Sequence, residues 1–159
     1  MLFRSRGISA LIRGAHSVSL HLRLQHGVSD QGRVVYSPER IRPTHEVLRA
    51  FYNRALGLLR RTAPDLHVFL FSDAAPAALA GLEGLKVTPV PRDPSDPPWV
   101  DMWLMSQCRH NIIANSSYSW WAAWLNRHPD KRVYAPEQYL PFYSKNRPRN
   151  VYPPDWVVL

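Results

Sequence analysis

The sequence has few of the features that mark several protein classes, and cysteine is the scarcest of them. It contains one cysteine, Cys108, so no disulfide can form within the chain, and no cluster of Cys and His has zinc spacing. No apolar run approaches the roughly 20 residues that span a bilayer. Uninterrupted apolar stretches, such as Val68 to Phe71, have the length of a strand. We therefore expect neither a disulfide-stabilised scaffold nor a segment that crosses a membrane.

Acidic residues are also scarce at the start of the chain. The first is Asp30, whereas residues 1–16 carry three arginines. The apolar piece Ile8 to Ile12 is shorter than the roughly 7–15 residues of a secretory h-region, and no small-residue cleavage pattern follows it. We expect 1–16 to be an irregular N-terminal segment, and 17–159 to form one domain.

The excess of basic residues favours an anionic partner. The formal net charge is +8 and the isoelectric point is about 10.1. Nucleic acid, a phosphorylated small molecule or an acidic membrane face would each fit this charge. The basic residues are scattered, and no nucleic-acid-binding motif accompanies them. We therefore interpret most of them as a solvated surface and expect no nucleic-acid partner.

Hydrophobic patterns alternate between strand and helix along the chain. The expected strands are Val18 to Leu24, His67 to Phe71, Lys86 to Val90, Asn111 to Ala114, Lys131 to Ala135 and Trp156 to Leu159. The expected helices run from Thr44 to just before Pro64, from about Pro76 to Leu82, from Trp99 to Cys108 and from Trp120 to Leu125. This alternation predicts an α/β fold, a Rossmann-like and mostly parallel sheet with helices on both faces.

Five tryptophans lie in the last two of these helices. They are Trp99, Trp103, Trp120, Trp121 and Trp124. Their spacing matches a buried helical face, so we interpret them as core residues and not as a platform for stacking sugars.

Ligands of an open parallel sheet bind beyond the carboxyl ends of its strands, and three groups of polar residues follow expected strands. The first group is His21 with Arg23, the second is Ser72 with Asp73, and the third is the run from Asn115 to Ser119. The third run leads into a helix, where backbone N–H groups, hydroxyls and the positive helix end can together hold an anion.

Each of these residues also has a purely structural interpretation. Asn115 or a serine can cap the helix, and Arg23 can be a surface charge. His21 can be a hydrogen-bonded residue of the sheet. Asp73 can accept hydrogen bonds from an N–H edge of a ligand or begin the next helix.

A long continuous segment gives a more specific indication. Residues 101–125 read DMWLMSQCRHNIIANSSYSWWAAWL, and they closely resemble the signature of glycosyltransferase family 11, the α-1,2-fucosyltransferases. Ala122 replaces the glycine that usually follows the tryptophan pair. Shorter blocks agree in order: Phe71-Ser72-Asp73, Ala135-Pro136 and Pro154-Asp155-Trp156.

The resemblance implies a donor-binding domain of GT-B type that uses GDP-fucose as donor, without a metal or another cofactor. It implies inverting transfer of fucose to the 2-hydroxyl of a terminal galactoside. Arg23, the implied catalytic residue, would contact the donor β-phosphate and stabilise the leaving GDP. The implied donor-binding residues are His21, Arg23, Ser72, Asp73, Asn115, Ser116, Ser117 and Ser119. A bacterial enzyme of this kind would act in the cytoplasm or at the cytoplasmic face of the inner membrane, with peripheral membrane association.

The sequence departs from the family at one block. The family reads His-x-Arg-Arg-Gly-Asp, whereas this chain reads HLRLQH over residues 21–26. An amino-terminal half that contributes to the acceptor side precedes this block in the family, so we expect the chain to correspond to the carboxyl-terminal, donor-binding half. A GDP-sugar-binding remnant that no longer transfers is the alternative.

Overall fold

The structure is a computed structural model that describes residues 2–22, 27–28, 34–35, 38–72, 82–93, 95–137 and 151–159. Its helices are α1 (Leu2–Arg13), α2 (Pro38–Arg60), α3 (Trp99–Ser106) and α4 (Ser117–Leu125). Its strands are β1 (Ser17–Leu22), β2 (Gly27–Val28), β3 (Val34–Val35), β4 (His67–Ser72), β5 (Lys86–Pro89), β6 (His110–Ile112), β7 (Val133–Ala135) and β8 (Val157–Val158). The short helix expected from about Pro76 lies almost entirely outside the described residues.

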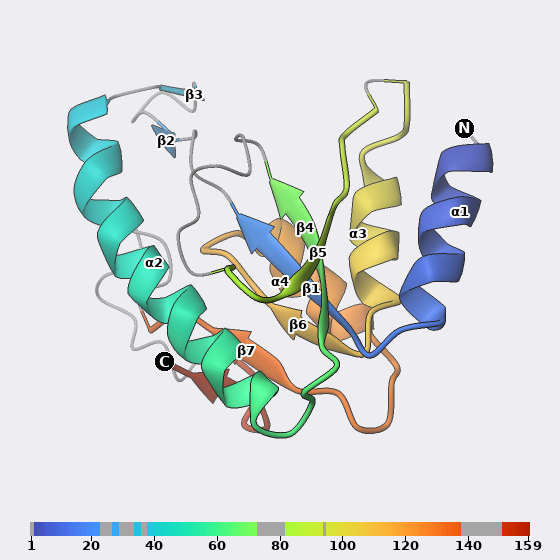
Figure 1. The fold of residues 1–159 in the computed structure, drawn as a ribbon. Helices are drawn as coiled ribbons and strands as arrows, with labels where there is room; N and C mark the ends of the chain where they lie inside the picture. The colour runs from blue at the N-terminus through green and yellow to red at the C-terminus, as the bar shows by residue number, and fades with distance from the viewer. Residues whose placement is uncertain are drawn as a thin grey trace.

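The main sheet has six strands in the order β5-β4-β1-β6-β7-β8, and every neighbouring pair is parallel (Figure 1). Numbered by their order in the chain, these strands read 3-2-1-4-5-6, which is the Rossmann order. The order reverses at β1, the central strand. The short strands β2 and β3 form a separate antiparallel pair. The predicted Rossmann-like parallel sheet is confirmed.

One face of the sheet is covered by α2. Val18, Leu20 and Leu22 of β1 point to this side and are fully buried, as their alternation predicted. They pack with Phe51 and Leu59 of α2 in one hydrophobic cluster. Burial of each such side chain contributes about 1.5–3 kcal/mol to folding.

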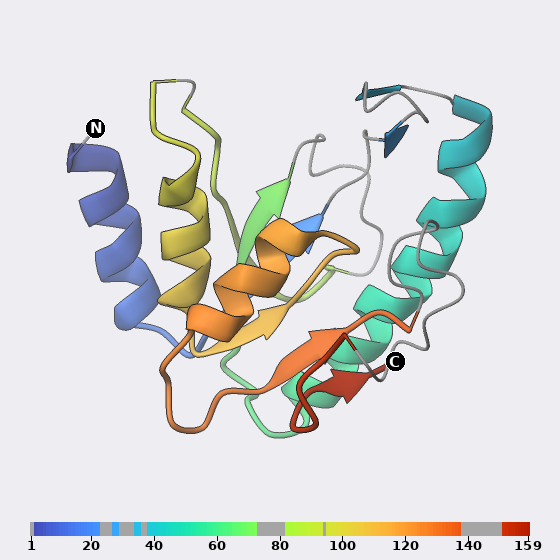
Figure 2. The same ribbon diagram turned by 180° about the vertical axis from the view of Figure 1, so that it is seen from behind.

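The other face is covered by α1, α3 and α4. Figure 2 shows α4 in front of the sheet, with α3 and then α1 beside it. Ile12 of α1, Phe69 of β4, Leu104 of α3 and Ala122 of α4 belong to one buried cluster on this side. Helices therefore lie on both faces of the sheet, as expected.

The expected irregular start is wrong for most of residues 1–16, because Leu2–Arg13 forms α1. Ile8 and Ile12 are one helical turn apart and pack into the cluster formed with α3. Tertiary packing therefore stabilises a helix that composition alone did not indicate. Likewise, α2 begins before the expected Thr44, at Pro38, and continues through Pro43. Pro38 stands at the first helical position, where the missing N–H removes no helical hydrogen bond, whereas Pro43 removes one in the second turn.

The prediction of tryptophan burial is largely wrong. Exposed fractions are 55% for Trp99, 37% for Trp103, 50% for Trp121 and 52% for Trp124. Trp120 is half-buried. The inward faces of the two helices are formed by other residues: Val100, Leu104 and Met105 of α3, and Ser119, Ala122 and Ala123 of α4. Small residues allow α4 to lie close to the sheet, which leaves no room there for an indole ring.

Candidate functional site

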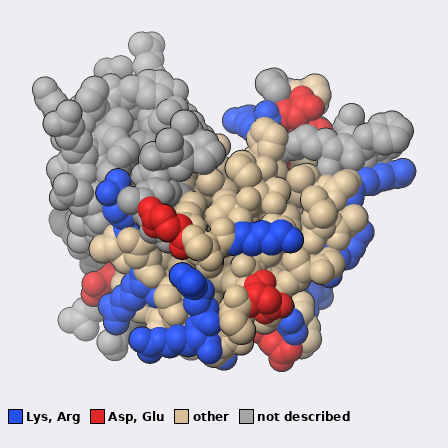
Figure 3. Space-filling model, in the orientation of Figure 1, with Lys and Arg blue, Asp and Glu red and all other residues tan. Residues whose placement is uncertain are grey.

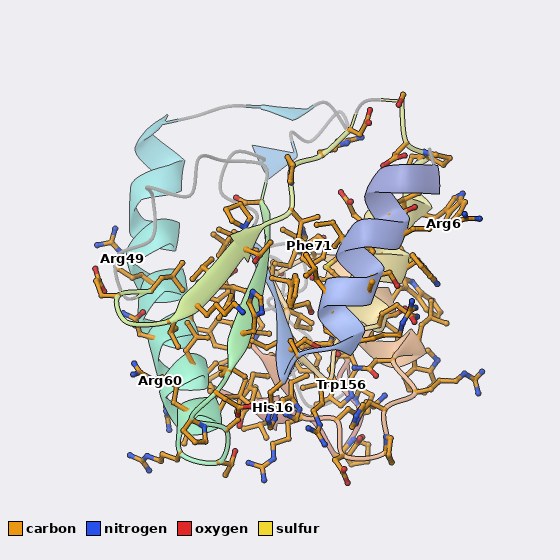
Figure 4. The ribbon with its side chains drawn as sticks, turned by 45° about the vertical axis from the view of Figure 1, so that its right-hand side comes forward. Arg6, His16, Arg49, Arg60, Phe71 and Trp156 are labelled. Atoms are coloured by element: carbon orange, nitrogen blue, oxygen red, sulfur yellow. The ribbon has the colours of Figure 1, made fainter. Side chains whose placement is uncertain are left out.

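A cleft of about 290 Å³ lies at the carboxyl end of the sheet. Its lining comes from the ends of the neighbouring strands β1 and β4, from the connection that follows β5, and from α3 and α4. The lining residues are His21, Phe71, Ser72, Val90, Arg92, Asp93, Asp96, Pro97, Pro98, Asp101, Met105 and Tyr118. Figure 4 shows Phe71 at this end of the molecule and His16 at the opposite end. The cleft therefore lies where a parallel sheet of this order binds ligands.

Two of the predicted site residues, His21 and Ser72, line this cleft together. They come from neighbouring strands and lie one register position apart, because His21 is opposite Phe71 and Leu22 is opposite Ser72. The backbone carbonyl of His21 accepts a hydrogen bond of 3.0 Å from the Tyr52 hydroxyl of α2. This bond ties the end of β1 to the helix on the other face. Arg23 and Asp73 lie outside the described residues.

Tyr118, which the sequence analysis did not single out, joins the two helices beside the cleft. Its hydroxyl accepts a hydrogen bond of 2.9 Å from the Met102 backbone N–H and donates one to the Pro98 carbonyl. Its ring centroid lies 6.0 Å from that of His21. Burial raises the pKa of Tyr118 above its ordinary value, so the phenol keeps its proton at neutral pH. Tyr118 therefore fixes the start of α3 against the start of α4.

The serine run at the start of α4 divides into structural and accessible members. Ser116 is the N-cap, and its hydroxyl accepts a hydrogen bond of 3.3 Å from the Tyr118 N–H. Ser119 is buried, where its hydroxyl accepts from the Ala114 N–H at 3.2 Å and donates to the Ser116 carbonyl at 3.2 Å. Ser117 is exposed and Asn115 is half-buried. The capping interpretation thus applies to Ser116, and a role for the run in donor binding stays a prediction.

The charges of the described cleft are mainly acidic. Arg92 is the only cation among the described lining residues, whereas Asp93, Asp96 and Asp101 all line the cleft. Asp93 is held by its neighbour, because its carboxylate accepts hydrogen bonds from the Ser95 N–H at 2.9 Å and hydroxyl at 2.7 Å. Sequence reasoning missed these carboxylates because they lie in or beside a proline-rich connection and do not follow a strand directly. They can accept hydrogen bonds from N–H or O–H groups of a ligand.

Within the described ranges, no group of three or more His, Cys, Asp or Glu residues is placed to hold a metal ion. The single thiol, Cys108, is fully buried, and burial raises its pKa well above the usual range. A thiol in that state is a poor nucleophile. No helix within those ranges is long and apolar enough to cross a membrane.

A parallel sheet in Rossmann order, with a polar cleft at its carboxyl end, defines a doubly wound α/β domain whose ligand site lies at that end. The comparison with known families is more specific. Residues 90–159 match the model of Glycosyl transferase family 11. The matched segment contains α3, β6 and α4, and with them the signature and the serine run. The predicted resemblance is confirmed.

Curated relatives extend the similarity toward the start of the chain. The chain is 31% identical over 141 residues to the O-antigen biosynthesis glycosyltransferase WbnK of Escherichia coli, a match that covers 86% of this chain and 43% of the relative. It is 30% identical over 126 residues to the alpha-1,2-colitosyltransferase of Escherichia coli, covering 78% of this chain and 41% of the relative. The chain thus spans less than half the length of these two enzymes.

Proposed function

We propose that the chain is the donor-binding part of a glycosyltransferase that transfers L-fucose from GDP-fucose to the 2-hydroxyl of a terminal galactoside. The observation that carries this proposal is the family match over residues 90–159, because the matched segment builds α3 and α4 beside the cleft. The relatives are named as sugar transferases, which supports a nucleotide-sugar donor and a glycan acceptor. Peripheral association with the cytoplasmic face of a bacterial inner membrane is part of the proposal.

The donor diphosphate would lie near the carboxyl end of β1. Arg23 follows β1 by one residue, and its guanidinium can bind two phosphate oxygens at once. The start of α4 adds backbone N–H donors and the positive end of the helix, with no acidic residue in the first turn. These groups would stabilise the charge that develops on GDP as its bond to the sugar breaks. The proposed transfer step uses no divalent metal.

The guanine base would lie toward the acidic part of the cleft. Its N1–H and exocyclic amine are hydrogen-bond donors, and a carboxylate such as Asp101 accepts from both at once. Uracil has no such pair of adjacent donors. The cleft chemistry therefore favours GDP over UDP.

A second candidate donor is a colitosyl nucleotide, because one relative is named as a colitosyltransferase. Colitose differs from fucose by the absence of the 3-hydroxyl. A site that hydrogen-bonds this hydroxyl would reject colitose strongly, whereas a site that tolerates its absence would accept both sugars. Competition of GDP-fucose and GDP-colitose for the same site separates the two candidates.

Calorimetric titration with nucleotides tests the proposal. We expect the chain to bind GDP and GDP-fucose in the presence of EDTA, and to bind UDP more weakly. Adding Mg²⁺ to a chelator-free sample is expected to leave the GDP affinity unchanged. Binding that needs a divalent cation would contradict the metal-free site, and equal affinity for UDP would contradict the guanine subsite.

A further inference from the structure

Two exposed tryptophans of α3, Trp99 and Trp103, line one groove together with the exposed Leu125 of α4. These two helices pack side by side on the same face of the sheet. We call Trp99, Trp103 and Leu125 the tryptophan face; their exposed fractions are 55%, 37% and 49%. An indole side chain offers about 150–250 Å², so each half-exposed ring leaves on the order of 100 Å² in solvent. An apolar patch of a few hundred Å² is about the size of the largest patch on a typical monomer, which is often functional.

A shallow groove of about 600 Å³ runs along the tryptophan face. Trp99 and Trp103 line it from α3, and Leu125 lines it from α4. Arg13 at the end of α1, and Arg127 and His128 after α4, line it as well. No Asp or Glu is among its lining residues. The groove is thus lined by apolar, uncharged polar and cationic side chains.

We propose that the tryptophan face binds the surface of an anionic lipid bilayer. Indole rings favour the membrane interface because they combine an apolar body with a polar N–H group. Arg13 and Arg127 would contact the lipid phosphates while Trp99 and Trp103 enter the headgroup region. The net charge of +8 adds a general attraction to an anionic surface.

The charge at the groove favours a lipid surface over two other occupants. A two-fold contact with a second copy would bring the same arginines of both copies into one interface, where like charges repel. A neutral glycan would stack on indole rings but would gain nothing from the exposed aliphatic side chain of Leu125 or from the cations. An anionic bilayer complements the indoles, the aliphatic side chain and the cations together.

The tryptophan face is separate from the proposed donor site, although both use α3. Pro98, Asp101 and Met105 face the cleft, whereas Trp99 and Trp103 line the groove. Vesicle binding therefore does not require nucleotide, and nucleotide binding does not require vesicles. This inference specifies the membrane contact named in the proposed function, but its failure would leave the donor proposal intact.

Vesicle sedimentation tests the electrostatic part of the proposal. The full chain is mixed with vesicles of phosphatidylcholine alone, or with vesicles in which phosphatidylglycerol replaces a third of that lipid. We expect at least about tenfold stronger partition to the anionic vesicles, and a loss of this preference at high salt.

The double variant Arg13→Gln and Arg127→Gln should lose most of the preference. Its matched control, Arg54→Gln and Arg60→Gln, makes the same change of charge on exposed residues of α2, on the opposite face of the sheet; Figure 4 shows Arg60 on that helix.

Quenching of tryptophan fluorescence by brominated acyl chains tests the aromatic part. We expect quenching on anionic vesicles, strongly reduced in Trp99→Ala with Trp103→Ala, while GDP affinity stays unchanged. If this double variant does not fold, the single variant Trp99→Ala at its 55% exposed site provides the same comparison. Equal partition to both vesicle types, or equal losses in the two arginine pairs, would overturn the proposal. So would a dimer in solution that Trp103→Ala dissociates, since a second copy would then cover the surface.

Discussion

At the scale of single residues, Arg23 carries the sharpest prediction because it supplies the proposed phosphate contact. Arg23→Ala should weaken GDP binding by about 1.5–3 kcal/mol, the range for a hydrogen bond to a charged group, and leave the fold intact. Arg23→Lys should recover only part of the loss, because an ammonium cannot bind two oxygens in a planar fork. Calorimetry measures both, with the exposed Arg54→Ala as control. If the Arg23 variants bind GDP like the parent, Arg23 is a surface charge.

The altered block after β1 yields a second residue-scale prediction. A glycine beside a phosphate allows close approach of the backbone that Gln25 would obstruct, and His26 cannot supply a carboxylate. We expect donor binding without efficient transfer, even when the amino-terminal part of a relative is supplied. Leu24→Arg, Gln25→Gly and His26→Asp together should raise transfer from GDP-fucose to lactose. Equal rates for the parent and the restored chain, each with that part supplied, would show that the substitutions are tolerated.

Sequence reasoning found the part of the candidate site that follows strands and missed the part that does not. His21 and Ser72 were predicted because the end of each strand of a parallel sheet meets the same edge. Tyr118 and Asp101 reach the cleft only because α3 and α4 pack against each other. Such a contact depends on tertiary structure and leaves no local pattern in the sequence.

At the scale of elements, the inward face of α4 explains why the tryptophans point outward. Ala123 is fully buried against the sheet. Ala123→Leu should destabilise the fold by about 1–3 kcal/mol, because a close-packed interior cannot accept extra methylenes without strain. Thermal unfolding measures this loss as a fall in midpoint of roughly 2–4 °C per kcal/mol. Trp121→Leu, at an exposed position of the same helix, should change stability by no more than about 0.5 kcal/mol. An Ala123→Leu variant as stable as the parent would contradict close packing here.

The order of the elements was predictable, whereas the orientation of two helices was not. Alternation in β1 and the apolar run of β4 follow directly from burial in a parallel sheet. In α4, Trp120, Trp121 and Trp124 recur at helical spacing, but so do Ala122, Ala123 and Ser119 on the opposite side. Hydrophobicity alone selects the tryptophans as the buried face, and close approach to the sheet selects the small residues instead.

At the scale of the whole molecule, the positive charge is not concentrated in one stripe on the face that Figure 3 shows. Lysine and arginine side chains there lie along the lower border, across the middle and toward the upper right, with acidic side chains among them. A stripe of cations that tracks a phosphate backbone is the usual sign of nucleic-acid binding. This distribution fits the interpretation of a solvated basic surface, and the absence of a nucleic-acid partner stays a prediction.

A pair of histidines links β1 to β6 at the end of the sheet opposite the cleft. The Arg132 N–H donates to Nδ1 of His110 at 3.1 Å, so neutral His110 carries its proton on Nε2. That nitrogen lies 3.2 Å from Nε2 of His16, which can accept a hydrogen bond from it. Nδ1 of His16 lies 3.4 Å from a carboxylate oxygen of Asp65. The hydrogen bonds of this pair thus require His110 to be neutral.

Stability of the whole chain should therefore fall in acid. Burial, followed by the nearby charges of His16, Arg109, Arg132 and His128, lowers the pKa of His110 from 6.5 to about 4. Between these values the unfolded chain binds a proton at this position and the folded chain does not, so stability is full above pH 6.5 and falls as the pH drops toward 4. Urea unfolding of the parent across this range should show the fall.

Burial also lowers the pKa of His67, which acts in the same direction, so the decisive comparison is with His110→Gln. That variant loses hydrogen bonds and should be less stable at neutral pH, but its stability should depend less steeply on pH between 6.5 and 4. The same slope in both proteins would mean that His110 takes up its proton equally in the folded and unfolded chains.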